Sequence, residues 1–98
     1  MYEKLGNFIH GEWRTSNEIG QDVLNPANES GLAFLPHATE KDLEDALESA
    51  QKGFKIWRDT SVQKRASILH KTADLIEERT NQISQVITLE QGKPLSEA

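Results

Sequence analysis

Glu90 lies in the stretch TLEQGKPLSEA, where a carboxylate stands one residue before a Gly-Lys-Pro turn. A carboxylate in such a place serves as an acid or base when its pKa is perturbed, or as a ligand when other oxygens join it around a hard cation. The turn itself is no phosphate-binding loop, because it lacks the upstream glycine and the following hydroxyl of a Walker A motif. Helix termination at Gly92 explains the turn, and a solvated carboxylate is the ordinary interpretation of Glu90.

The other residues that could do chemistry are scattered. His10, His37 and His70 are far apart, and none has metal-type spacing with another ligand, so surface or packing roles are expected. Glu77 and Glu78 lie in the middle of an expected helix and are expected to be solvated. The chain has no cysteine, which excludes a thiolate nucleophile and a disulfide within it. The residues alone therefore predict no catalytic machinery.

The composition is that of a soluble segment, polar for a self-sufficient globule. The 98 residues are 36% hydrophobic, with a net charge of -5 and a mean hydropathy of -0.64. No run of five like charges occurs, which argues against nucleic-acid or anionic-membrane partners. No apolar stretch approaches the roughly 18 residues of a membrane span. The start also lacks the apolar core of a signal peptide. A cytoplasmic protein is expected.

Residues 1–38 are predicted to form short strands and turns. Phe8-Ile9 and Trp13 flank the letters HGE, which indicates a β-hairpin with a three-residue turn. Val23-Leu24 and Leu32 to Leu35 are further strand candidates, each followed by a proline within two residues. Strands this few and short need a partner sheet or helix.

Residues 39–98 are predicted to be helical. Thr39 is a good N-cap for the first helix, and Asp42 at the third helical position gives an imperfect capping box. Apolar residues then recur at spacings of three and four along one face, which predicts a stripe packed in a core. The stripe consists of Leu43, Ala46, Leu47, Ala50, Phe54 and Trp57.

Two more helices are expected after the first. Thr60 or Ser61 caps the second, which is apolar on two sides and therefore predicted to pack between neighbours. Thr80-Asn81 is the expected break before the third helix. Gly92 is the expected C′ residue of that helix, in the left-handed conformation that glycine permits.

Five motifs occur in an order that resembles the amino-terminal segment of the aldehyde dehydrogenase superfamily, over nearly the whole chain. Two of them, NPAN and TLEQGKPLSEA, are most similar to the succinate-semialdehyde dehydrogenase group. The five motifs are FIHGEWR (Phe8 to Arg14), VLNPANES (Val23 to Ser30), the A…A..GF..W helix (Ala46 to Trp57), RASILHKTADLIEER (Arg65 to Arg79) and TLEQGKPLSEA (Thr88 to Ala98).

The resemblance implies a Rossmann-like α/β parent fold and an NAD- or NADP-dependent enzyme that oxidises succinate semialdehyde to succinate. In that family a cysteine thiolate attacks the aldehyde, hydride passes to nicotinamide, and a glutamate-activated water hydrolyses the thioester. These groups lie beyond Ala98, so no catalytic and no cofactor-binding residue is expected here. The chain is expected to end where a longer protein was cut.

The resemblance also implies partners for this segment. Alone it is an α+β segment with short strands before three helices, an incomplete portion of the cofactor-binding domain. The rest of the dehydrogenase chain is its implied partner, and the aldehyde is the substrate of a parent that forms a homo-dimer or homo-tetramer. An isolated segment with exposed apolar surface is expected to self-associate or to pack loosely.

A cation site is the one functional site that the resemblance places within these residues. Many family members hold a monovalent cation with main-chain carbonyls before the Asn-Pro turn and with an acidic residue before the Gly-Lys-Pro turn. Those positions are Val23, Leu24 and Glu90 here. Oxygen ligands of this kind suit a hard cation. Many relatives carry Asp in place of Glu90.

Two alternatives to an enzyme fragment remain open. The chain could be a complete small helical module that uses the stripe from Leu43 to Trp57 to bind another protein. It could also be a truncated relic that modulates a full-length dehydrogenase by competing for its docking surface.

Overall fold

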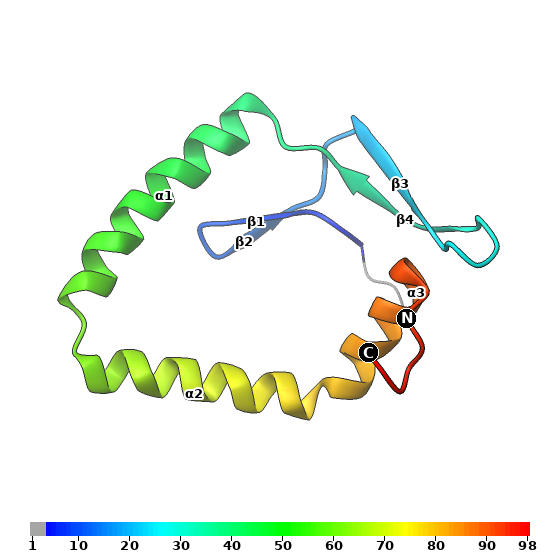
Figure 1. Ribbon diagram of the computed structural model, residues 1–98. Helices are drawn as coiled ribbons and strands as arrows, with labels where there is room; N and C mark the ends of the chain where they lie inside the picture. The colour runs from blue at the N-terminus through cyan, green and yellow to red at the C-terminus, as the bar shows by residue number, and fades with distance from the viewer. Residues whose placement is uncertain (1–3) are drawn as a thin grey trace.

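The computed structural model describes residues 4–98, which form two β-hairpins followed by three helices (Figure 1). The predicted α+β organisation, strands first and helices after, is confirmed. The elements are β1 (Asn7–Ile9), β2 (Glu12–Arg14), β3 (Gly20–Leu24), β4 (Gly31–Pro36), α1 (Glu40–Asp59), α2 (Val62–Glu78) and α3 (Thr80–Gln91).

The first hairpin pairs β1 with β2 and places Phe8 opposite Trp13, with ring centroids 5.0 Å apart. Its turn contains two residues, His10 and Gly11, with φ values of 52° and 77°. The predicted three-residue turn is therefore wrong, because Glu12 already pairs with Ile9. A two-residue turn with positive φ at both positions matches the twist of the strands.

The second hairpin pairs β3 with β4 and has a register shift between Val23 and Leu24. Its loop is closed by the N–H of Asn25, which donates to the Ser30 carbonyl at 2.9 Å. The Asn25 side-chain oxygen accepts from the N–H of Ala27 at 2.9 Å. Asparagine closes such turns because its side chain bonds its own backbone two residues on.

Helix α1 begins with a complete capping box. The Thr39 hydroxyl accepts from the N–H of Asp42 at 3.0 Å, and the Asp42 carboxylate accepts from the N–H of Thr39 at 2.9 Å. Aspartate therefore closes both bonds, although glutamate is preferred at this position. The start of α1 is fixed by these two residues.

Ser61 caps α2, and Gly92 ends α3 in the left-handed conformation with φ 78°, as predicted. The break between these helices falls at Arg79, so the predicted break at Thr80-Asn81 is wrong by one or two residues. Thr80 starts α3 because its hydroxyl donates back to the Glu77 carbonyl at 2.7 Å and satisfies the end of α2. Within residues 4–98, no helix has the length and apolarity that crossing a membrane requires.

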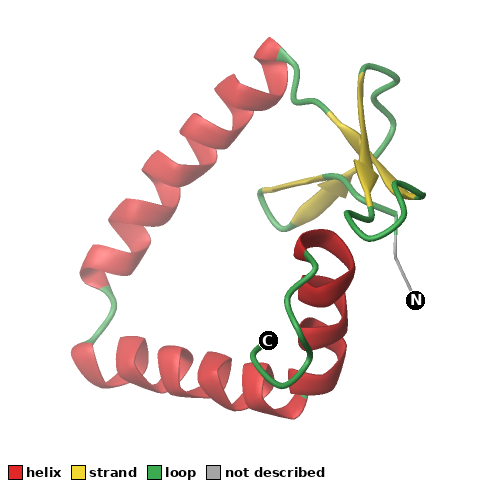
Figure 2. Ribbon diagram, turned by 45° about the vertical axis from the view of Figure 1, so that its right-hand side comes forward, coloured by secondary structure: helices red, strands yellow, loops and turns green. Residues whose placement is uncertain are grey.

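The elements form an open frame. Helices α1, α2 and α3 follow one another around three sides, and the two hairpins lie along the remaining side and the interior (Figures 1 and 2). The radius of gyration is 16.9 Å, whereas a compact domain of this length has about 13 Å. The principal extents are 48 × 35 × 16 Å, so the frame is flat.

Few side chains are buried in this frame. Among residues 4–98 Ile9, at 7% exposed, and Pro36 are the buried ones. The predicted core position of Phe54 and Trp57 is wrong for this chain, since they are 63% and 38% exposed. The predicted packing of α2 between neighbours also fails, because Ile76 and other apolar residues of α2 are exposed. No described element covers these faces.

Candidate functional site

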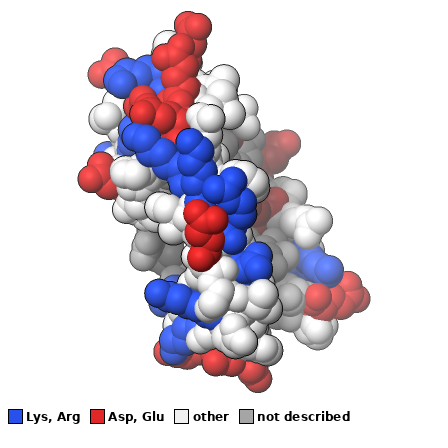
Figure 3. All heavy atoms as spheres, turned by 90° about the vertical axis from the view of Figure 1, so that its left-hand side faces the viewer, with Lys and Arg blue, Asp and Glu red and all other residues white. Residues whose placement is uncertain are grey.

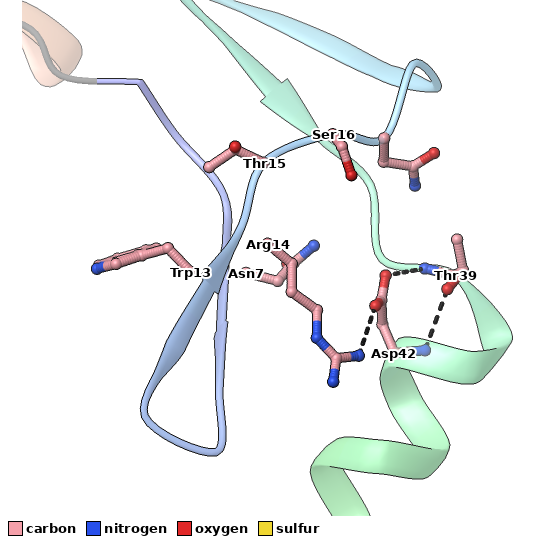
Figure 4. A pocket seen from close by; sticks show the side chains of 8 residues that line it. Asn7, Trp13, Arg14, Thr15, Ser16, Thr39 and Asp42 are labelled. Carbon is pink, nitrogen blue, oxygen red and sulfur yellow. Dashed lines mark hydrogen bonds and ion pairs between the residues drawn. The ribbon is translucent and has the colours of Figure 1, made fainter.

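A charged joint attaches the first hairpin to α1. Arg14, the last residue of β2, donates through Nη1 to Asp42 Oδ1 at 2.9 Å (Figure 4). The same Nη1 donates to Asp45 Oδ2 at 2.8 Å. The cross-strand register places Arg14 opposite Asn7, on the hairpin face that also carries the buried Ile9. One guanidinium therefore bonds two carboxylates in successive turns of α1. Ile9, the one buried hydrophobic residue within residues 4–98, lies on the same face of the hairpin.

The joint perturbs the acidity of its members. Bonds from the Thr39 backbone N–H and from the Arg14 guanidinium hold the pKa of Asp42 below its ordinary value. Arg14 and then Lys41 lower the pKa of Asp45 in the same way. The two carboxylates in turn raise the pKa of Arg14. All of these groups are charged near neutral pH.

The joint is expected to make stability depend on acidity. Because the pKa of Asp42 and Asp45 is lower folded than unfolded, their stabilisation is complete above the unfolded value near 3.8 and is lost as pH falls through the lower folded values. We expect the melting temperature, followed by helix ellipticity, to drop between pH 7 and pH 3. An Asp42→Asn/Asp45→Asn chain should show a smaller drop. Asp22→Asn, at an exposed strand position, should change nothing, and an unaltered drop in the double variant would contradict this account.

A polar hollow of about 470 Å³ lies beside the joint (Figure 4). The Asn7 side-chain nitrogen is buried there without a hydrogen-bond partner. Both carboxylate oxygens of Asp42 are already engaged by Arg14 and Thr39, so the carboxylate is not available as a base. Asp42 therefore holds the hairpin to the start of α1 beside this hollow. The hollow is lined by Asn7, Trp13, Arg14, Thr15, Ser16, Asn17, Thr39 and Asp42.

The three histidines lie apart, as the sequence suggested. His10 Nδ1 lies 3.1 Å from Ser49 Oγ and links the hairpin turn to α1. His37 and His70 are exposed. Within residues 4–98, no three His, Asp or Glu side chains are grouped closely enough to hold a metal ion. His37 and His70 thus lie at the surface, and His10 contacts α1.

The segments that carry the candidate cation ligands adjoin. Val23 and Leu24 end β3, and Glu90 lies exposed in the last turn of α3. A Cβ placed on Gly92 would lie 3.4 Å from Pro26 Cγ, so the end of α3 touches the Asn-Pro turn. The structure thus brings the two halves of the candidate site to the same region, although they are far apart in sequence.

The groups in this region suit a hard cation. The register shift between Val23 and Leu24 interrupts the ladder of β3 and β4, and a bulge leaves backbone groups unpaired. The Thr88 hydroxyl, in the last turn of α3, is buried without a partner. Glu90 makes no ion pair within residues 4–98. Carbonyl, hydroxyl and carboxylate oxygens are the ligands such cations take.

A basic corner joins the end of α1 to the start of α2. Residues 52–71 carry six Lys or Arg against one Asp, although the whole chain has a net charge of -5. Figure 3 shows these charges as a band across this side of the molecule, with acidic side chains above and below it. The sequence interpretation missed this corner because it searched for runs of like charge. The six residues are Lys52, Lys55, Arg58, Lys64, Arg65 and Lys71.

Comparison with known proteins decides the family. The sequence profile of the Aldehyde dehydrogenase family matches residues 13–98, which is most of the chain. The chain belongs to the aldehyde dehydrogenase family. The family resemblance seen in the five motifs is therefore confirmed.

Relatives within the aldehyde dehydrogenase family are longer. A malonate-semialdehyde dehydrogenase of Lacticaseibacillus casei is 42% identical over 95 residues, which are 96% of this chain and 19% of that protein. Relatives with 35% to 42% identity share this name, and none of these is named after succinate semialdehyde. This chain spans about one fifth of the length of these aldehyde dehydrogenases.

Solved structures of family members contain the same open frame. An E. coli NADP dependent enzyme superimposes with a TM-score of 0.89 at 33% identity, over 98% of this chain and 20% of that one. A betaine aldehyde dehydrogenase of Staphylococcus aureus in complex with NAD+ superimposes with a TM-score of 0.86 at 28% identity, over 96% of this chain and 20% of that one. The frame is thus part of the aldehyde dehydrogenase fold.

Proposed function

We propose that this chain is the N-terminal part of an NAD(P)-dependent semialdehyde dehydrogenase, which oxidises the aldehyde carbon of a short carboxylic semialdehyde to a carboxylate. The observation that carries the proposal is the group of relatives named malonate-semialdehyde dehydrogenase, which match 96% to 98% of this chain. Malonate semialdehyde is accordingly the proposed substrate. Succinate semialdehyde is the second candidate, favoured by the NPAN and TLEQGKPLSEA motifs.

Within that enzyme the chain supplies framework. It has no cysteine, so the nucleophile of the family reaction comes from elsewhere in the enzyme. Its exposed apolar side chains on α1 and α2 support a role as a portion of the cofactor-binding domain, covered by the remaining polypeptide. The nicotinamide cofactor binds outside these residues in this proposal. The parent is a homo-oligomer, a dimer or tetramer.

The cation site belongs to the same proposal. The carbonyls of Val23 and Leu24 and the carboxylate of Glu90 would hold a monovalent cation in the assembled enzyme, with further ligands from the remaining polypeptide. The contact between Pro26 and the end of α3 supports it, because a cation there would tie the two segments together. Its role is structural, since none of these groups lies among catalytic residues.

The native protein tests the proposal. We expect an intact mass about five times the 11.0 kDa of this chain, because the chain covers 19% of its relative. The purified protein should reduce NAD+ or NADP+ with a semialdehyde, and the ratio of kcat/KM for malonate over succinate semialdehyde decides the substrate. Betaine aldehyde, which lacks a carboxylate, is the matched control. A native mass of 11.0 kDa without dehydrogenase activity would reject the proposal.

A further inference from the structure

Arg65 differs from the other basic residues of the corner between α1 and α2. The other five are exposed, whereas Arg65 is half-buried. Within α2 the residues that are not exposed are Arg65 and Leu75, so a charged side chain is among the two most shielded of this helix. Arginine is almost never shielded from water in this way unless it is paired.

The guanidinium of Arg65 has no partner within residues 4–98. Its Nε is closed off from solvent and makes no hydrogen bond. None of the ion pairs in this part of the chain includes Arg65. The residues one turn away on the same side of α2 carry no charge, and they are Ser61, Val62, Ile68 and Leu69. An unbonded donor of a charged group is costly when water cannot reach it, so its partner comes from elsewhere.

The position of Arg65 on α2 indicates where that partner lies. By the helical period Arg65 lies between two apolar stripes, with Val62 and Leu69 on one side of it and Ile68 on the other. These three side chains are 67%, 63% and 45% exposed. A helix that is apolar on two sides packs between neighbours. The polypeptide that covers α2 in the whole enzyme therefore also encloses the guanidinium.

The first turn of α2 also lacks a negative charge. It contains no acidic residue, and it carries the bases Lys64 and Arg65. The amino-terminal end of a helix has a partial positive charge, which an acid usually compensates. One carboxylate beside Arg65 would compensate both the guanidinium and this end of the helix.

We propose that Arg65 forms a buried ion pair with an aspartate or glutamate of the polypeptide outside these residues, and that this pair fixes α2 in the whole enzyme. The inference rests on the proposed function, since this chain spans about one fifth of the length of related aldehyde dehydrogenases. A carboxylate accepts two parallel bonds from a guanidinium and neutralises its charge. A cofactor phosphate is a poorer fit, because no glycine lies between Gly53 and Gly92 to form a phosphate-binding turn.

A crystal structure of the whole enzyme tests the pair directly. We expect a carboxylate oxygen of a residue outside these 98 within about 3.2 Å of a guanidinium nitrogen of Arg65. A guanidinium bonded only to water, to main-chain carbonyls or to a cofactor phosphate would overturn the inference. The mass and activity of the same protein separate the two proposals. A long, active dehydrogenase with Arg65 unpaired would reject this inference alone, whereas an inactive native chain of 11.0 kDa would reject both.

Variants of the whole enzyme give a second measurement. Arg65→Met removes the charge, keeps much of the volume and leaves the partner carboxylate buried and alone. It should lower the midpoint of thermal unfolding by about 5–10 °C at about pH 8. Isolation in an apolar site raises the pKa of a carboxylate, so protonation should shrink this difference from the wild type as the pH falls to about 5.5.

Two further variants control this result. Arg65→Lys keeps the charge but loses the planar fork, and its midpoint should lie between those of Arg65→Met and the wild type. Lys71→Met removes an exposed charge from the opposite side of α2 and should shift the midpoint by less than about 1 °C. A drop for Arg65→Met that is equal at both pH values would indicate a packing role and overturn the inference. A raised KM for the cofactor with an unaltered midpoint would also overturn it, because the partner would then be a phosphate.

Discussion

Ile9→Ala is expected to release the first hairpin from α1. Ile9 is the buried apolar side chain through which this hairpin packs, at 7% exposed, and truncating a buried isoleucine to alanine costs about 2–3 kcal/mol at a site that relaxes easily. Amide hydrogen exchange measures this loss of stability separately for each part of the chain. We expect the protection of β1 and β2 amides to fall about 30- to 150-fold, while α2 amides exchange as before.

Two variants control this prediction. Ile9→Val removes one methyl group and should cost only about 1 kcal/mol. Ile19→Ala shortens a side chain that is 72% exposed and should leave protection within about twofold of the original, since exposed substitutions have small effects. Equal effects for Ile9→Ala and Ile19→Ala would mean that the polar contacts of Arg14 and His10 hold the hairpin and that Ile9 contributes little.

Gly92→Ala and Gly53→Ala are expected to have effects of opposite sign. Gly92 has φ 78°, a conformation that strains any residue with a Cβ, so the alanine should cost about 1–2 kcal/mol. Gly53 lies inside α1 with open space around it. Alanine at that position should stabilise the helix by up to about 1 kcal/mol. The two melting temperatures, followed by helix ellipticity, should shift in opposite directions.

The signs of these two shifts in melting temperature distinguish an effect of local backbone geometry from an effect of general helix propensity. If Gly92→Ala also raised the melting temperature, the left-handed end of α3 would not be required.

Much of the fold could be predicted because its signals are local. The capping of α1 by Thr39 and Asp42 and the end of α3 at Gly92 depend on residues within one turn of each other. The length of the hairpin turn was mispredicted because His10 accepts positive φ, which no rule based on glycine alone anticipates. The break between α2 and α3 was predicted one or two residues too late. The Thr80 hydroxyl satisfies a carbonyl at the end of α2, and so Thr80 can begin α3.

The site was less predictable because its contacts are long-range. Asp42 was recognised as a capping residue, yet its partner Arg14 lies 28 positions earlier and no spacing rule joins them. The stripe of α1 was correctly located, but the core it was expected to enter is absent from residues 4–98. A periodic pattern predicts that a face will be covered and carries no information about which polypeptide covers it.

A frame 16 Å thick is hardly thicker than one helix, which measures about 10–12 Å with its side chains. Most side chains already face water before the chain unfolds. The heat capacity increment of unfolding and the denaturant slope both scale with newly exposed area. Both should therefore fall well below the values of a globular domain of this length, for which the increment is about 1.2–1.5 kcal/mol/K. Thermal unfolding should accordingly extend over a broad range of temperature.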